Sequence, residues 1–69
     1  MQRKRVNSSK VRSIGYDEKT QTLEVELTNG QLWQYPKVYP EVYRRFMAAP
    51  NPTSFFEDRI AEDYTGKRV

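Results

Sequence analysis

Cysteine and histidine are both absent from this 69-residue chain, and their absence narrows the chemistry open to it. Without cysteine there can be no disulfide, no thiolate metal site and no cysteine nucleophile. Without histidine, zinc sites and acid–base catalysis near neutral pH lack their usual side chain. No glycine-rich phosphate loop and no metal-ligand spacing is present either. The sequence therefore predicts a protein that is not an enzyme, with no catalytic residues, no cofactor and no metal ion.

Long apolar runs are also missing. The basic start of the chain is followed by polar residues 7–9 rather than by the apolar core of a signal peptide. No stretch approaches the roughly 18 apolar residues that a membrane-spanning helix needs. We therefore expect no membrane contact and a cytoplasmic location. Residues 1–69 are predicted to form a single domain with a thin core, and residues 1–6 a flexible basic tail.

The clearest pattern in the chain is a β-hairpin over residues 22–35. Leu23, Val25 and Leu27 alternate with glutamates, which is the pattern of a strand with one dry face and one wet face. Asn29-Gly30 is the predicted turn, because both residues tolerate the positive φ that tight hairpins require.

Two registers of this hairpin fit the turn. A two-residue loop would place Trp33 and Tyr35 on the open face of the sheet, where they could stack on bases. A three-residue loop with Gly30 in a bulge shifts the pairing by one residue, sets Val25 opposite Trp33 and turns both rings to the core. We favour the three-residue loop, because so short a chain needs its largest apolar side chain in the core.

The rest of the sheet and its covering layer follow from weaker signals. Residues 10–16 resemble a strand that would join the hairpin through a turn at 17–20 and complete a three-stranded antiparallel meander. We expect an α+β fold in which two short helices pack on one face of this sheet. The expected core consists of Ile14, Tyr16, Leu23, Val25, Leu27, Trp33, Val38, Val42, Phe46, Phe56 and Ile60.

Proline and serine residues set the predicted helix ends. Pro40 suits the first position of a helix that runs to Ala49, and the following Pro50-Asn51-Pro52 would stop it. Ser54 and Glu57 have the spacing of a capping box, which predicts that a second helix begins at Ser54 and runs to about residue 63.

Several short motifs, in this order and spacing, resemble the KTSC family over nearly the whole chain. Val6-Asn7-Ser8-Ser9 resembles the opening motif of the family, Ile14-Gly15-Tyr16-Asp17 its first strand, and Trp33-Gln34-Tyr35 its central Tyr-x-Tyr motif. KTSC domains occur at the C-terminal end of some lysyl-tRNA synthetases and as small free-standing bacterial or phage proteins. RNA binding has been suggested for the family. Glu57 and Glu62-Asp63 depart from the family pattern by adding negative charge near the last helix.

Basic and aromatic side chains are the candidate binding residues, because the first can contact phosphates and the second can stack on bases. The basic candidates are Arg3, Lys4, Arg5, Lys10, Arg12, Arg44, Arg45, Lys67 and Arg68. The aromatic candidates are Trp33, Tyr35, Tyr39 and Tyr43. The prediction is a small non-enzymatic module that binds nucleic acid, with RNA as the favoured ligand.

The alternative is a protein-interaction module or a small regulator of a larger complex, such as a polymerase or a synthetase. Arginine and aromatic side chains are typical of interface hot spots, and the acidic last helix could itself be the contact face. A small sheet with an open face and free edges could also form a homodimer. Salt dependence separates these hypotheses, because binding to phosphates weakens steeply as salt rises.

Overall fold

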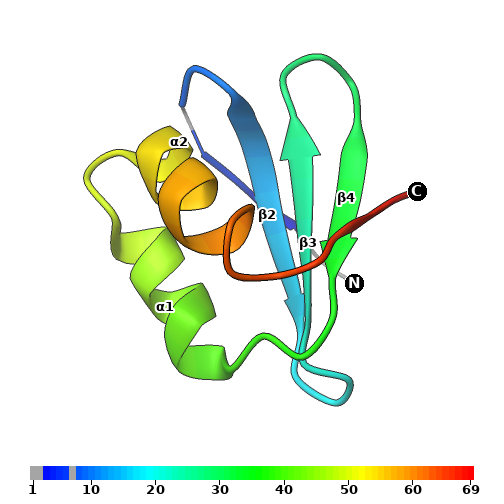
Figure 1. Ribbon diagram of the computed structural model, residues 1–69. Helices are drawn as coiled ribbons and strands as arrows, with labels where there is room; N and C mark the ends of the chain where they lie inside the picture. Colours follow the sequence, from blue (N-terminus) through cyan, green and yellow to red (C-terminus); the bar gives the residue numbers. More distant parts are fainter. Residues whose placement is uncertain (1–2, 7) are drawn as a thin grey trace.

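Five antiparallel strands form one sheet, in which they lie in the order of the chain. Figure 1 shows the three central strands side by side. The computed structural model describes residues 3–6 and 8–69. The strands are β1 (Arg3–Arg5), β2 (Val11–Asp17), β3 (Thr22–Leu27), β4 (Leu32–Tyr35) and β5 (Lys67–Arg68). The α+β class and the antiparallel meander are confirmed, and the meander corresponds to the central strands β2, β3 and β4.

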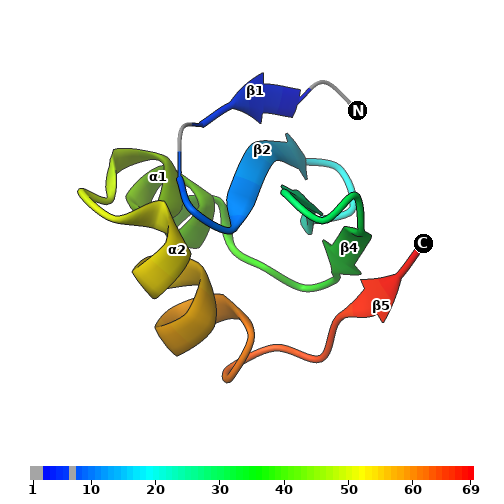
Figure 2. The same ribbon diagram turned by 90° about the horizontal axis from the view of Figure 1, so that it is seen from above.

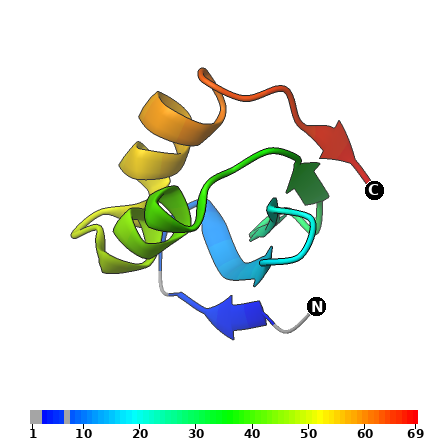
Figure 3. The same cartoon turned by 90° about the horizontal axis from the view of Figure 1, so that it is seen from below.

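The two outer strands correct the prediction of a three-stranded sheet. β1 pairs with β2, and β5 pairs with β4, so that each lies at one edge (Figure 3). Arg3–Arg5 thus form an edge strand rather than the predicted flexible tail, while Met1 and Gln2 lie outside the described residues. Short charged edge strands carry no apolar alternation, so the pattern that revealed the central strands could not reveal these.

The hairpin adopts the three-residue register, which confirms that prediction. The Leu27 N–H donates to the carbonyl of Gln31 at 2.8 Å, and Val25 lies opposite Trp33. Within this hairpin, Gly30 is the residue with a positive φ, of 91°. Asn29 instead supports the turn through its side-chain oxygen, which accepts from the backbone N–H of Gln31 at 3.0 Å. A bulge with glycine in the left-handed region accounts for this arrangement.

The first helix, α1 (Pro40–Ala48), begins at the predicted proline and ends next to Ala49, whose backbone is extended. The residue before a proline resists the helical conformation, and Pro50 follows Ala49 directly. The prediction of the first helix is therefore confirmed to within one residue.

The second helix begins earlier than predicted, and the capping box at Ser54 is wrong. α2 (Pro52–Phe55) has Asn51 as its N-cap, and the Asn51 side-chain oxygen accepts from the Ser54 N–H at 3.2 Å. Pro52 fills the first helical position, where its missing N–H removes no hydrogen bond. The chain continues without a break into a π-helical turn, η1 (Phe56–Ile60), closed by a 2.8 Å hydrogen bond from the Ala61 N–H to the Phe56 carbonyl.

The core lies between one face of the sheet and the helices, which all cover that face (Figure 2). Tyr16, Leu27, Trp33 and Val42 from the predicted core are only partly buried and pack around its border. Val11 belongs to the core although the sequence did not predict it there, and Tyr35, which the favoured register turns to the core side, is buried as well. The buried apolar residues are Val11, Ile14, Leu23, Val25, Tyr35, Val38, Phe46, Phe56 and Ile60.

Candidate nucleic-acid interface

The sheet face opposite the helices carries polar and charged side chains in rows that cross several strands. We call it the open face. Residues paired directly across strands point to the same side of a sheet, so the register defines each row. One row contains Arg5, Ser13, Glu26 and Leu32. The next row contains Arg3, Gly15, Glu24, Gln34 and Lys67.

A β-bulge brings one more arginine to this face. The register shifts between Val11 and Ser13, which leaves Arg12 unpaired between them. Simple alternation would turn Val11 outward and Arg12 inward. The bulge reverses both, so that Val11 is fully buried and Arg12 is exposed. It therefore explains both a core residue that was not predicted and the place of a predicted basic residue.

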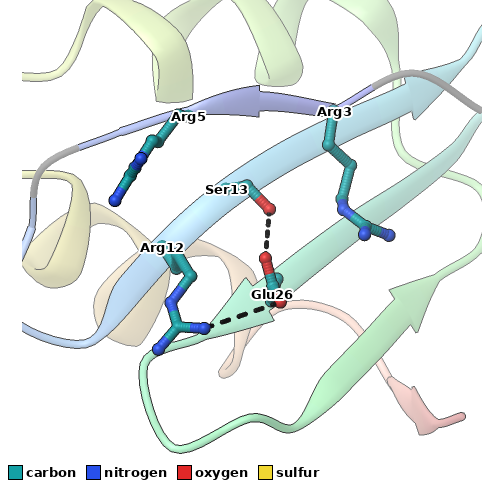
Figure 4. A pocket seen from close by; sticks show the side chains of 5 residues that line it. All are labelled: Arg3, Arg5, Arg12, Ser13 and Glu26. Carbon is teal, nitrogen blue, oxygen red and sulfur yellow. Dashed lines mark hydrogen bonds and ion pairs between the residues drawn. The ribbon is translucent and has the colours of Figure 1, made fainter.

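Three arginines line an open groove of about 620 Å³ on this face (Figure 4). Arg3 and Arg5 reach it from β1 and Arg12 from β2, around Ser13 and Glu26. We call this the arginine groove.

The carboxylate of Glu24, next to the groove, is fully committed to partners of the same row. One oxygen forms an ion pair with Arg3, and the other accepts from the Gln34 amide at 2.9 Å. Desolvation of Glu24, which is only 6% exposed, would by itself raise its pKa. The hydrogen bonds from Gln34 and Arg3 and the charge of Arg3 outweigh that effect, and together they lower the pKa below its ordinary value. The Arg3 guanidinium is therefore held in place by Glu24, which also neutralises part of its positive charge.

The charged side chains around the arginine groove have weaker or fewer partners than Glu24 has. Ser13 Oγ donates to one oxygen of Glu26 at 2.9 Å, while the other oxygen lies 3.9 Å from the Arg12 guanidinium. Arg12 also donates to the carbonyl of Thr28 at 3.1 Å. Within the described part of the chain, Arg5 takes part in none of the ion pairs. Arg5 and Arg12 thus keep most of their hydrogen-bond donors for a ligand, since a guanidinium carries five.

The other predicted basic residues do not join this groove. Lys4 is paired with Ile14 and lies toward the helix side, as does Arg68, which is paired with Trp33. Lys67 shares the open face but lies at the far edge, on β5.

The helical and loop basic residues are separate from one another as well. Lys10 forms an exposed ion pair with Glu57 at 2.7 Å, and Arg45 forms one with Glu41 on α1 at the same distance. Arg44 is exposed on α1. The structure therefore brings together Arg3, Arg5 and Arg12, and leaves the remaining candidates dispersed.

The aromatic candidates do not share a surface with the arginine groove. Tyr35 is buried, and burial raises the pKa of its hydroxyl. Trp33 packs beside it on the helix side, with the ring centroids 6.4 Å apart. Tyr43 stacks on Tyr16, with centroids 4.9 Å apart and planes 12° from parallel. Of the four candidates only Tyr39, at 66%, is largely exposed, whereas Trp33 and Tyr43 are half-buried.

Thr53 is a polar residue whose role was not predicted from the sequence. It is 7% exposed, and its hydroxyl lies within hydrogen-bond distance of the Ser8 and Ser9 hydroxyls and of the Lys10 N–H. The Thr53 N–H donates in turn to Ser8 Oγ at 3.0 Å. The serine pair therefore anchors the first turn of α2 to the strand side of the molecule. The only signal in the sequence was two serines without an assigned partner.

Two further observations concern the residues that the structure describes. Within 3–6 and 8–69, no helix combines the length and the apolar character needed to span a membrane. In the same ranges no side-chain cluster has the composition of a metal site.

Comparison with known proteins gives a consistent result. The family model of the KTSC domain matches residues 7–64. An uncharacterized protein of Stutzerimonas stutzeri (strain A1501) is 45% identical over 49 residues, which is 71% of this chain and 69% of that protein. A crystal structure of a KTSC domain protein from Yersinia pestis has a TM-score of 0.92 and 32% sequence identity, and the match covers 99% of this chain and 96% of that chain. The resemblance inferred from the sequence is confirmed, and the chain belongs to the KTSC domain family.

Proposed function

We propose that this protein is a small, non-enzymatic, cytoplasmic module that binds RNA by contacting its phosphates with the open face of the sheet. The observation that carries the proposal is the gathering of Arg3, Arg5 and Arg12 from two strands around one groove. Guanidinium groups match phosphate oxygens with paired donors, and arginine is the side chain most often used where such recognition matters.

The three arginines differ in their ion-pair partners, and this difference suggests different roles in binding. Arg3 is held by the buried Glu24, so it contributes a fixed donor at the border of the groove. Arg5 has no ion-pair partner among the described residues, and Arg12 meets a carboxylate only at 3.9 Å. These two are expected to carry most of the phosphate contact.

The position of the aromatic rings defines the mode of binding. Because Trp33 and Tyr35 pack on the helix side, the open face offers donors for the backbone but no stacking platform. We therefore expect weak dependence on base sequence and strong dependence on salt.

Fluorescence anisotropy of a labelled single-stranded RNA of mixed sequence tests this proposal. We expect binding at low salt, and we expect the double substitution Arg5→Gln with Arg12→Gln to weaken it at least about tenfold. The plot of log affinity against log salt should become shallower by roughly 1.4, which is about 0.7 for each of two lost phosphate contacts. Trp33 emission should not change on binding.

The matched control is Arg44→Gln with Arg59→Gln, which removes the same charge from exposed positions on α1 and η1. An equal loss in both double variants would mean attraction by net charge alone and would contradict a site at the groove. Absence of binding at low salt would overturn the proposal and make a protein partner, or a second copy of the chain, the function to test.

A further inference from the structure

We propose that Glu26 makes the arginine groove selective for RNA over DNA, by accepting a hydrogen bond from a ribose 2′-hydroxyl next to a phosphate held by Arg5 and Arg12. This inference rests on the proposed function, and it assigns a specificity-determining residue to the same site.

Glu26 has a free acceptor inside the groove. Its Oε1 accepts from Ser13 at 2.9 Å, whereas its Oε2 approaches Arg12 only to 3.9 Å, which is too far for a hydrogen bond. The Glu26 side chain is 26% exposed and belongs to the groove lining. A carboxylate oxygen can accept two hydrogen bonds, so Oε2 can still take a donor from a ligand.

Glu24, two residues earlier on the same strand and the same face, shows what a committed carboxylate looks like. Both of its oxygens are engaged, by Arg3 and by Gln34, and its side chain is 8% exposed. Structural pairing therefore accounts for Glu24 completely. Glu26 has the same side chain on the same face, but one of its oxygens lacks a hydrogen bond and meets only the Arg12 guanidinium among the described residues, in a long ion pair of 3.9 Å.

A carboxylate oxygen that lacks a hydrogen bond is unfavourable inside a phosphate site unless the ligand brings a donor to it. The carboxylate repels the phosphate, and it loses solvation when the ligand covers it. In RNA the ribose 2′-hydroxyl lies next to the backbone phosphate and can donate to Glu26, and this group is absent from DNA. DNA brings no donor to Glu26, so the carboxylate should weaken DNA binding. RNA brings the 2′-hydroxyl, and its hydrogen bond should offset this cost. A polar group that only RNA can satisfy therefore discriminates against DNA.

The experiment compares three labelled oligonucleotides of one uracil-containing sequence: RNA, DNA with deoxyuridine, and 2′-O-methyl RNA. The wild-type protein should bind RNA about tenfold more tightly than DNA, a factor that corresponds to 1.4 kcal/mol. The 2′-O-methyl RNA keeps the backbone but has no 2′ donor, so it should bind about as weakly as DNA.

Two substitutions separate the charge of Glu26 from its acceptor. Glu26→Ala removes both, so DNA and 2′-O-methyl RNA should bind more tightly and the preference for RNA should disappear. Glu26→Gln keeps an acceptor oxygen and removes the charge, so both nucleic acids should bind more tightly while part of the RNA preference remains. Thermal unfolding of each variant verifies that it is folded.

The outcomes distinguish the two proposals. If the wild type binds neither RNA nor DNA at low salt, the proposed function fails and this inference fails with it. If the wild type binds RNA, DNA and 2′-O-methyl RNA equally, or if Glu26→Ala keeps the wild-type preference, the role of Glu26 is overturned and the arginine groove stands as a site for phosphates alone.

Discussion

The two faces of the sheet are made from alternate residues of the same strands, yet different forces hold them. On the helix-covered face, Ile14, Leu23 and Val25 are fully buried and pack under the helices. On the open face, Ser13, Glu24 and Glu26 are linked by hydrogen bonds and ion pairs to their neighbours and to the arginines.

This difference separates folding from ligand binding. Apolar burial is the dominant favourable term in folding, and here it lies almost entirely on one face. Exposed ion pairs contribute little to stability, so the open face can carry unpaired donors at small cost. Substitutions on the helix-covered face should therefore change stability, and substitutions on the open face should change binding.

The largest effect is expected for Phe46→Ala. Phe46 is fully buried and stacks on Phe55 at a centroid distance of 5.3 Å, so truncation should reduce the free energy of unfolding by about 3–5 kcal/mol. Urea denaturation measures the loss. Leu32→Ala is the control from the open face and should cost less than about 1 kcal/mol. Equal losses in the two variants would mean that both faces of the sheet contribute equally to stability, which would contradict the difference described above.

Gly66→Ala should have the next largest effect, because it disturbs the border of the helix-covered face. A Cβ at this position would lie 2.4 Å from the Tyr35 ring, which is buried and cannot move aside. We expect a loss of about 1–3 kcal/mol from overpacking. Faster amide exchange at Val69, whose N–H donates to the Leu32 carbonyl at 2.8 Å, would show that β5 is released.

Gly30→Ala is the matched control for that experiment. Nothing lies within 4 Å of a Cβ at Gly30, but its φ of 91° strains any other residue. The expected cost is about 1–2 kcal/mol, with exchange at Val69 unchanged. Loss of Val69 protection in both variants would mean that β5 depends on global stability alone.

Thr53→Val tests the polar link between α2 and the Ser8-Ser9 segment. Valine keeps the shape but removes the hydroxyl, so the Lys10 N–H loses its acceptor, and the free energy of unfolding should fall by about 1–3 kcal/mol. Thr53→Ser keeps the hydroxyl and should retain more of the stability. A serine variant as unstable as the valine variant would assign the effect to the lost methyl group. Denaturant unfolding measures both variants.

The smallest effect is expected for Glu24→Gln, and it concerns pH. The pKa of Glu24 is lowered in the folded state, so the unfolded chain binds more protons as the pH falls. The contribution of Glu24 is therefore present above the unfolded pKa of about 4.3 and is lost as the pH falls through the folded pKa. As the pH is lowered below about 5, the unfolding free energy of Glu24→Gln should therefore decrease by less than that of the wild type.

A pH series of denaturant titrations measures this difference. Glu62→Gln removes an exposed carboxyl group beyond η1 and tests whether the change of slope is particular to Glu24. An unchanged slope in Glu24→Gln would sharpen the comparison, because the open face would then contribute nothing measurable to stability through this group.

The parts of the fold that the sequence predicts correctly depend on local patterns. The alternation of Leu23, Val25 and Leu27 identifies the first strand of the hairpin, and Asn29-Gly30 identifies its turn. Pro40 identifies the start of α1. These signals are contained within a few residues, so they can be read without knowing the rest of the chain.

The parts that were missed depend on distant partners or on competing local signals. The bulge at Arg12 is a feature of the pairing between β2 and β3, so it depends on residues that are distant in the sequence. Asn51 and Ser54 are both good caps, and only the structure shows that Asn51 is the one used. The site follows the same rule: the sequence names the arginines, but only the sheet register shows which of them share a face.

The basic residues on β1 and β5 have a consequence for the behaviour of concentrated solutions. A sheet edge with unpaired backbone groups can pair with the edge of another molecule and start an aggregate. Here both outermost strands consist only of arginine and lysine, Arg3–Arg5 on one side and Lys67–Arg68 on the other. Any edge-to-edge encounter between two copies therefore brings like charges together. This repulsion weakens as the Debye length shrinks from about 10 Å at 0.1 M salt to about 3 Å at 1 M. Colloidal stability should thus decrease at high salt, where light scattering would detect the first oligomers.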